Sequence, residues 1–208
     1  MPTELSRLAS QIEPEKTILF FGAGASISSH APSVTKIMEE FEKKFEIARD
    51  GYSLREYTSI IESNFSRHAM IAELRKLFAG LKPTGSLLTL PLYKWKSIYT
   101  TNYDDLIEQS YRKKEINFSV FESNYDFTLQ NKPGAVSIFK LHGSINKDVV
   151  DGSNARIIIS DADYDHTQTF REALYDRLKS DLHGSHFIIV GHSLADEHIK
   201  DIANRQAE

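Results

Sequence analysis

The sequence has 208 residues and contains no cysteine. Disulfide bonds, thiolate zinc sites and cysteine nucleophiles are therefore excluded. A chain without cysteine fits an intracellular setting best, and we expect a cytoplasmic protein. We also expect its chemistry to need no metal ion.

Long apolar runs and an excess of basic residues are also missing. Residues 1–16 lack the apolar stretch of a signal peptide, and no later run approaches the ~20 apolar residues that cross a bilayer. The 25 Lys and Arg residues face 29 Asp and Glu, for a net charge of −4. This balance gives no general electrostatic reason to bind nucleic acid or an anionic membrane, so neither is an expected partner.

Glycine and proline, at 10 and 6 residues, are too scarce for a long flexible linker. Because 40% of the residues are hydrophobic, the chain can build a real core, and we expect one compact domain over residues 1–208. The sequence ends soon after Ile199, where a last helix is expected to start. This leaves open that the chain is a portion of a longer protein.

Short apolar runs predict buried strands of a parallel sheet at residues 17–21, 97–100, 136–141, 156–160 and 187–190. Apolar residues at three-to-four spacing predict helices between or beside them, at residues 34–45, 69–78, 105–111 and 170–178. Strands that alternate with helices predict an α/β fold, a Rossmann-like doubly wound and mainly parallel sheet. Residues 50–91 show helical patches without a convincing strand, which predicts a helical excursion that covers part of a cleft.

Small and polar residues follow four of the predicted strands. Ligands of open parallel sheets bind beyond the carboxyl ends of the strands, so these residues are expected to face one cleft. The first group permits a tight turn whose backbone N–H groups can approach a phosphate. The four groups are Gly22-Ala23-Gly24-Ala25-Ser26, Thr101-Asn102-Tyr103-Asp104, His142-Gly143-Ser144 and Gly191-His192-Ser193.

Each group also has a purely structural interpretation. The glycine loop fits a tight strand-to-helix connection, and His142 fits a hydrogen-bonded histidine at a strand end. Asn102 and Asp104 are common helix-capping residues, and Asp196 is better explained as the cap of the last helix than as a catalytic carboxylate.

Two further patterns are rejected. Gly191 to Ala195 mimics the nucleophile elbow of α/β-hydrolases, but Asp196 and His198 follow too closely to complete a triad. Acidic residues from Asp161 to Glu172 have EF-hand spacing, but His166 replaces the required glycine. Acidic residues at the start of a helix explain this second pattern better.

In their order and spacing, the four groups make the chain resemble the sirtuin-like NAD-consuming domains, including the divergent bacterial NADases of abortive anti-phage defence. The resemblance spans residues 17–199. Deacylating sirtuins follow the glycine loop with Ile-Pro-Asp-Phe-Arg, whereas this chain has His30-Ala31-Pro32-Ser33-Val34. They also carry a four-cysteine zinc module that a chain without cysteine cannot build. The chain therefore looks more like the defence NADases.

The resemblance implies an NAD glycohydrolase that uses NAD as its substrate and releases nicotinamide and ADP-ribose. The Asn102 amide would position a water, and His142 would act as a base toward that water or a ribose hydroxyl. Asp104 would hold the nicotinamide carboxamide, and Ser193 would lie near the adenosine-side ribose or phosphate. The remaining predicted NAD contacts are Gly22, Ala23, Gly24 and Ser26 at the pyrophosphate, together with Ala25, Thr101, Gly143 and Gly191.

Other functions stay open at this point. One class is a protein deacylase or ADP-ribosyltransferase, and another is a non-catalytic sensor of NAD or ADP-ribose that serves as an assembly module. The resemblance also implies a homo-oligomer and a sensing or ATPase partner, either as a separate protein or as a fused domain. Residues 50–91 are the natural gate of the cleft, because they have no place in the predicted sheet.

Overall fold

The computed structural model describes residues 3–129, 134–148, 155–194 and 196–204. Its centre is a five-stranded sheet with the order β3-β4-β2-β1-β5, in which all paired neighbours are parallel. The chain leaves β1 for β2 on one side and returns to β5 on the other. The strands are β1 (Thr17–Phe21), β2 (Ser97–Thr100), β3 (Phe118–Phe121), β4 (Val136–Lys140) and β5 (His186–Val190).

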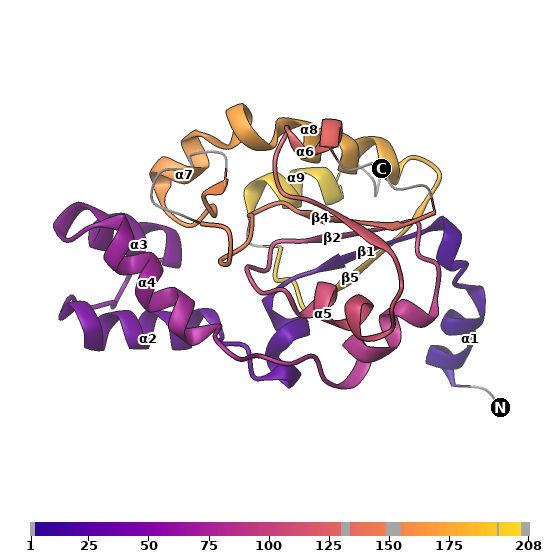
Figure 1. Cartoon of the computed structure of the whole chain (residues 1–208), viewed down its shortest axis with the longest axis horizontal. Coiled ribbons are helices and arrows are strands. Elements are labelled where there is room, and N and C mark those ends of the chain that lie inside the picture. The colour runs from indigo at the N-terminus through magenta and orange to yellow at the C-terminus, as the bar shows by residue number, and fades with distance from the viewer. Residues whose placement is uncertain (1–2, 130–133, 149–154, 195, 205–208) are drawn as a thin grey trace.

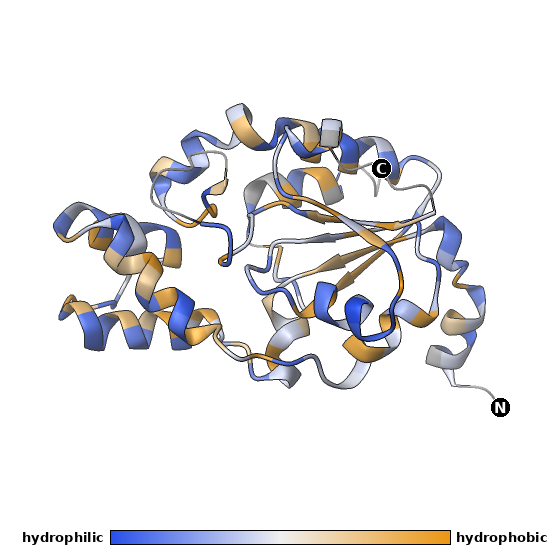
Figure 2. Ribbon diagram, in the orientation of Figure 1, coloured by the Kyte–Doolittle hydropathy of each residue, from blue (hydrophilic) through white to orange (hydrophobic). Residues whose placement is uncertain are grey.

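Alternating side chains of the strands build a core on each face of the sheet. Ile18 and Phe20 of β1 pack with α8 (Thr167–Leu182) and α9 (Glu197–Asn204). Leu19 and Phe21 point the other way and pack with α5 (Leu106–Lys113) and the 3₁₀ stretch η3 (Gly85–Leu92). Figure 1 shows helices above and below the strands, whose apolar residues are orange in Figure 2. The predicted α/β, Rossmann-like fold is therefore confirmed.

The predicted strands at residues 17–21, 97–100 and 187–190 are confirmed, and the run at 136–141 ends as a strand one residue early, at Lys140. No predicted strand corresponds to β3, the edge strand beside β4. Its four residues include a serine, and alternate side chains are partly exposed. Such a short amphipathic run lacks the continuous apolar signal of a central strand.

The strand expected at residues 156–160 is wrong, although Ile157, Ile158 and Ile159 are buried. Side chains, rather than a neighbouring strand, satisfy much of this backbone. The Ile157 N–H donates to Asp148 Oδ2 at 2.8 Å, and the Ile159 carbonyl accepts from Thr58 Oγ1 at 2.9 Å. The apolar composition of this run correctly predicted that it is buried. It could not predict that no neighbouring strand pairs with it.

Three helices form a lobe at one end of the sheet, at the left of Figure 1. They are α2 (Val34–Phe45), α3 (Leu54–Asn64) and α4 (Arg67–Leu77), and their apolar faces share one core with Ile145, Ile157 and Ile159. Serine side chains at positions 33, 53 and 66 cap their first turns. We call this unit the helical lobe. It combines the predicted helix at 34–45 with most of the predicted excursion at 50–91.

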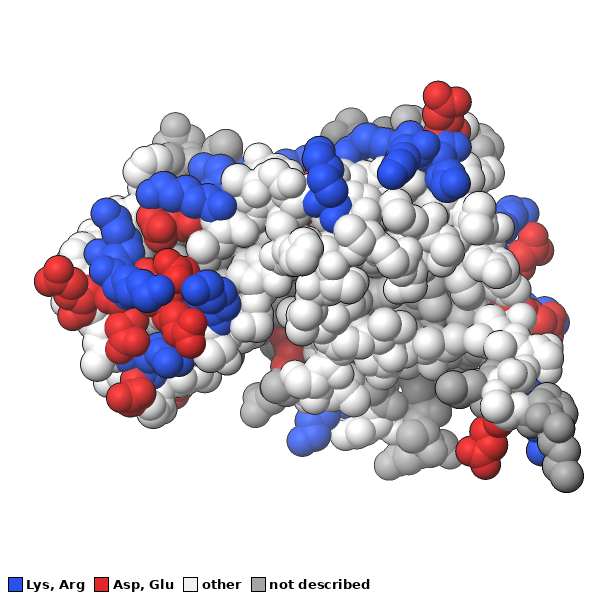
Figure 3. Space-filling model, turned by 90° about the horizontal axis from the view of Figure 1, so that it is seen from below, with Lys and Arg blue, Asp and Glu red and all other residues white. Residues whose placement is uncertain are grey.

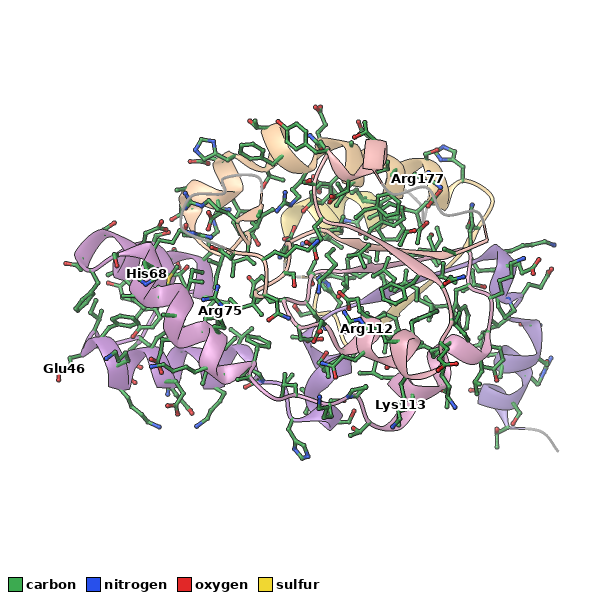
Figure 4. All side chains as sticks on the ribbon, in the orientation of Figure 1. Glu46, His68, Arg75, Arg112, Lys113 and Arg177 are labelled. Atoms are coloured by element: carbon green, nitrogen blue, oxygen red, sulfur yellow. The ribbon has the colours of Figure 1, made fainter. Side chains whose placement is uncertain are left out.

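The helical lobe is tied to the sheet body through polar contacts as well. Arg75 of α4, labelled in Figure 4, donates to the carbonyls of Asp148 at 2.6 Å and Ile145 at 3.4 Å. Figure 3 shows basic and acidic residues interspersed on the surface of the helical lobe. Among the ion pairs of α2, Lys36 and Lys43 each pair with Glu40 at 2.8 Å.

The remaining elements are short. They are α1 (Glu4–Gln11), the 3₁₀ stretches η1 (Pro14–Lys16) and η2 (Ala23–Ser29), α6 (Asp126–Leu129) and α7 (Asp161–Asp165). A capping box between Ser160 and Asp163 opens α7, which confirms a helix start as the explanation of these acidic residues. No helix within the described ranges is long and apolar enough to cross a membrane.

Candidate active site

The loops that follow β1, β2, β4 and β5 converge on a pocket of about 870 Å³. These loops form a polar wall, whereas the opposite wall comes largely from the helical lobe and includes Ile37, Met38 and Phe78. The predicted site residues that line the pocket are Ala23, Gly24, Ser26, Thr101, Asn102, Asp104, His142, Gly191 and Ser193. Four sequence-distant loops thus meet at the carboxyl edge of the sheet, as the strand order requires.

The glycines of the first and last loops pack directly against each other. The Gly24 N–H donates to the Gly191 carbonyl at 2.8 Å, and the Gly22 N–H donates to the Val190 carbonyl at 3.0 Å. A Cβ at Gly22 would lie 2.6 Å from the His192 Cα, and one at Gly191 only 2.2 Å from the Ala25 nitrogen. These glycines therefore allow the β1 and β5 loops to touch through their backbones.

Three predicted site residues, Gly22, Ala25 and Gly143, lie outside the pocket lining. Gly143 has a φ of +76°, and a Cβ there would approach the Arg171 guanidinium at 3.2 Å and the Arg156 carbonyl at 3.3 Å. The positive φ and the close packing around this position are each sufficient to explain why it is a glycine. An NAD contact at these three positions stays a prediction.

The Asn102 amide is buried and held in one orientation. Its Nδ2 donates to the Gly22 carbonyl and to Ser26 Oγ, both at 3.0 Å. Because both amide protons are used, Oδ1 is the remaining polar atom, and it has no hydrogen-bond partner among the described residues. Asn102 thus lines the pocket with its amide fixed, and Oδ1 is a buried acceptor without a partner among the described residues.

Asp104 is buried beside Ser26 and the first turn of α5. Its Oδ1 accepts a hydrogen bond from the Leu106 N–H at 3.1 Å. Burial raises the pKa of Asp104, while Lys140, the Leu106 N–H and the Ser26 hydroxyl act in the opposite direction. Lys140 lies behind this wall and was not among the predicted site residues. It is fully buried, pairs with Glu108 at 3.0 Å and donates to the Asp104 carbonyl. Buried polar contacts with Leu106 and Lys140 therefore hold Asp104 in place in the pocket wall.

His142 follows β4 and lies beside a carboxylate from the far end of the chain. Its Nε2 is 3.1 Å from Asp196 Oδ2, and both side chains are only 8% exposed. The approach is too bent for a good hydrogen bond, so Nε2 has no well-aligned partner among the described residues. Asp196 acts on the ring chiefly as a close negative charge.

Asp196 has two further contacts. Its Oδ1 accepts from the Ile199 N–H at 3.2 Å, which confirms the predicted cap of the last helix. Its Oδ2 accepts from the Tyr164 hydroxyl at 3.1 Å. Burial opposes ionisation, but His142, the Ile199 N–H and Tyr164 outweigh it and hold the pKa of Asp196 well below its usual range. Capping explains only one of its two oxygens.

His192 also lines the pocket, although it was not among the predicted site residues. Its Nδ1 accepts from the Leu194 N–H at 2.9 Å, and its ring packs edge-on against Phe20 at 5.0 Å. Burial and the neighbouring His142 lower the pKa of His192. A neutral ring with its proton on Nε2 fits these contacts.

The helical lobe supplies pocket residues that no sequence motif marked. Arg55 lies 4.4 Å above the Tyr164 ring and pairs with Asp161 at 2.5 Å. Tyr52 lines the same wall and is 46% exposed. Residues 50–91 were expected to cover part of the cleft, and several of them line the pocket. Which of their side chains reach the pocket depends on how the helical lobe packs against the sheet.

A parallel α/β sheet with a glycine loop after its first strand and polar loops around one pocket defines a Rossmann-like class of protein. Comparison with protein families then specifies the family. The model of the SIR2-like domain matches residues 96–208, and the chain belongs to this family.

Curated relatives cover nearly the whole chain. It is 25% identical over 93% of its length to the NAD(+) hydrolase ThsA of Cytobacillus dafuensis, and 27% identical over 95% to that of Enterococcus faecium. It is 26% identical over 91% of its length to the defense-associated sirtuin 2 of Bacillus subtilis. The chain spans 38%, 41% and 19% of these three proteins, so each relative has a further large part.

A solved structure of a Sir2 enzyme has the same fold. It superposes with a TM-score of 0.58 and 16% identity, and the match covers 99% of this chain and 83% of the other. The fold and the family therefore agree with the predicted sirtuin-like domain.

Proposed function

We propose that the chain is an NAD glycohydrolase domain of bacterial anti-phage defence. The observation that carries this proposal is the match over more than nine-tenths of the chain to proteins named NAD(+) hydrolase. The pocket supports it, because Asn102 and His142 come from different strands and line one cavity. A volume of about 870 Å³ also lies within the usual range for small-molecule sites.

The proposed reaction breaks the bond between ribose C1′ and the nicotinamide nitrogen. The bonding electrons leave with nicotinamide, so positive charge develops on the ribose carbon. A water oxygen forms the new bond to C1′ and gives up a proton, which yields ADP-ribose. Asn102 Oδ1 is suited to accept a hydrogen bond from that water, and His142 is suited to take its proton, directly or through a ribose hydroxyl.

The proposed NAD contacts follow the pocket wall. Ala23, Gly24 and Ser26 line the pocket at the start of η2 and are assigned to the pyrophosphate. The Gly24 N–H already donates to the Gly191 carbonyl, so Gly24 would contribute a close backbone approach and no hydrogen bond of its own. Asp104 is assigned to the nicotinamide carboxamide and Ser193 to the adenosine-side ribose or phosphate. Asp104 already engages Leu106 and Ser26, so it would contact the carboxamide with its remaining acceptor capacity.

The first test measures nicotinamide and ADP-ribose after incubation of the protein with NAD and a chelator, because the proposed chemistry needs no metal. His142→Ala and Asn102→Ala are each expected to lower turnover by about 100-fold or more while the fold is retained. His183→Ala is the matched control, since this histidine is exposed on the turn after α8, and its ring forms a hydrogen bond with the Lys179 carbonyl of its own helix at 2.9 Å. Near-wild-type turnover in either site variant would reject the assignment.

The same assay separates the other functions. Nicotinamide release that depends on an acyl-peptide would indicate a deacylase, and ADP-ribose retained on a protein would indicate a transferase. Binding of NAD without release of nicotinamide would indicate a sensor.

The proposal also places the enzyme in the cytoplasm, with control by homo-oligomerisation and by a sensing or ATPase partner or fused domain. Unrestrained NAD hydrolysis inside a cell would be toxic, so a resting state with a misaligned pocket is expected. The helical lobe is the proposed gate, because it forms one wall of the pocket.

A further inference from the structure

Asp196 stands apart from the other helix caps in the described residues because it also lies beside His142. A helix cap needs one acceptor for a backbone N–H, and Asp196 Oδ1 supplies it to Ile199. The second oxygen, Oδ2, lies between His142 Nε2 and the Tyr164 hydroxyl, at 3.1 Å from each. Asparagine or serine would serve equally well as a cap, so capping does not explain a carboxylate at this position.

A carboxylate at this distance decides which ring nitrogen carries the proton. In a neutral imidazole one nitrogen has an N–H and the other a lone pair. A lone pair on Nε2 would face the negative charge of Oδ2 and be repelled, whereas an N–H there is attracted. The bent approach weakens a hydrogen bond but does not alter this electrostatic preference.

Tyr164 holds the carboxylate in place from the other side. Its hydroxyl donates to Oδ2, and its ring meets the His142 ring edge-on with centroids 5.7 Å apart. The Tyr164 side chain therefore contacts both members of the pair. Since an acceptor that is already engaged has less freedom to rotate, the position of Oδ2 relative to Nε2 is set by packing as well as by charge.

We propose that Asp196 is a positioning residue that keeps the proton of neutral His142 on Nε2 and so leaves Nδ1 as the basic nitrogen for the reaction. This inference rests on the proposed function only for its catalytic consequence. The tautomer itself is a property of the free protein and can be observed without NAD.

The decisive measurement is the ¹⁵N NMR spectrum of protein labelled at its histidine rings, recorded at a pH where the rings are neutral. His142→Gln assigns the resonances of His142. In wild-type protein they are expected to report an N–H on Nε2. In Asp196→Asn an amide N–H can face Nε2 instead, so a shift toward the Nδ1–H form is expected.

Turnover provides the second readout. Asp196→Asn and Asp196→Ser both keep an N-cap acceptor and both remove the carboxylate. Each is expected to lower kcat by on the order of 10–100-fold with little change in KM, since the affected group acts through His142. Ser160→Ala is a control for the loss of a helix cap elsewhere, at the start of α7.

The outcomes separate the two proposals. A His142 ring that keeps its tautomer in Asp196→Asn would overturn the positioning role, and so would full kcat in both Asp196 variants of an active enzyme. If wild-type protein releases no nicotinamide while the tautomer changes as expected, the proposed function fails and the positioning role stands.

Discussion

Gly191 has both a positive φ and a close contact between its Cα and a neighbouring backbone segment. Its φ is +65°, a left-handed conformation that costs other residues about 1 kcal/mol, and its Cα faces the backbone of Gly24 and Ala25. Gly184 has nearly the same φ, +69°, but a Cβ there would meet nothing within 4 Å. The two glycines therefore separate backbone strain from close approach.

Gly184→Ala is expected to cost about 1 kcal/mol of unfolding free energy and to leave turnover unchanged. Gly191→Ala is expected to cost about 3 kcal/mol and to lower turnover at least about tenfold, because the loops after β1 and β5 must separate. Urea unfolding and nicotinamide release measure both variants. Equal losses in the two would show that the contact between these loops is unimportant.

Asn102 shows how neighbouring residues define a functional side chain. Its amide could present either its nitrogen or its oxygen to a ligand, and the sequence gives no indication of which. The carbonyl of Gly22 can only accept, so it selects the nitrogen and turns the oxygen into the acceptor. Gly22 thus sets the orientation of the Asn102 amide although it lies outside the pocket lining.

Among the elements, the junction between the helical lobe and the segment before α7 depends on buried charge. Arg67 of α4 is 15% exposed and binds Asp148 at 2.7 Å and Asp163 at 2.8 Å, and both carboxylates are nearly fully buried. Arg55 of α3 also reaches this region, but its pair with Asp161 is about half exposed. The junction thus contains both a buried and an exposed Arg–Asp ion pair.

Arg67→Gln is expected to lower the unfolding free energy by about 3 kcal/mol, because it removes the cation that pairs with buried Asp148 and leaves Asp163 with Arg156 alone. Arg55→Gln is expected to cost at most about 1 kcal/mol, because water screens an exposed pair. Denaturant titration of both variants tests the difference. A loss for Arg55→Gln as large as that for Arg67→Gln would contradict this account of the junction.

At the scale of the whole molecule, the pocket lies between the sheet body and the helical lobe, and its two walls come from different parts of the chain. A change of a few kcal/mol in how the lobe packs would change the fraction of active molecules by about a hundredfold. Contacts with further copies or with a partner could supply such a change. The chain also spans less than half the length of the curated relatives it matches, which contain more than this domain.

We therefore expect the isolated chain to hydrolyse NAD slowly and assembly to raise the rate. Turnover per chain, measured across a dilution series that spans the oligomer-to-monomer transition, is expected to fall on dilution. Mass measurement at each concentration shows where the transition lies. Constant turnover across it would exclude assembly as the switch.

The sequence by itself determined the fold class and the order of the polar loops. Short runs rich in apolar residues mark β1, β2, β4 and β5, because a sheet with helices on both faces buries side chains on both sides of its strands. Since parallel strands end at one edge, the order of the runs was enough to assign the loops after them to a common cleft. The cap at Asp196 was also predictable from the sequence, because capping is local.

Only the tertiary structure decided which side chains meet across that cleft. The apolar run at 156–160 has the composition of a strand, yet the Thr58 and Tyr103 hydroxyls, 101 and 55 positions away in the sequence, donate to its Ile159 and Ile158 carbonyls. Asp196 meets His142 for the same reason, since the two residues lie 54 positions apart in the chain and no local pattern links them. Local periodicity reports burial and helix ends, whereas partners are chosen by packing over long sequence distances.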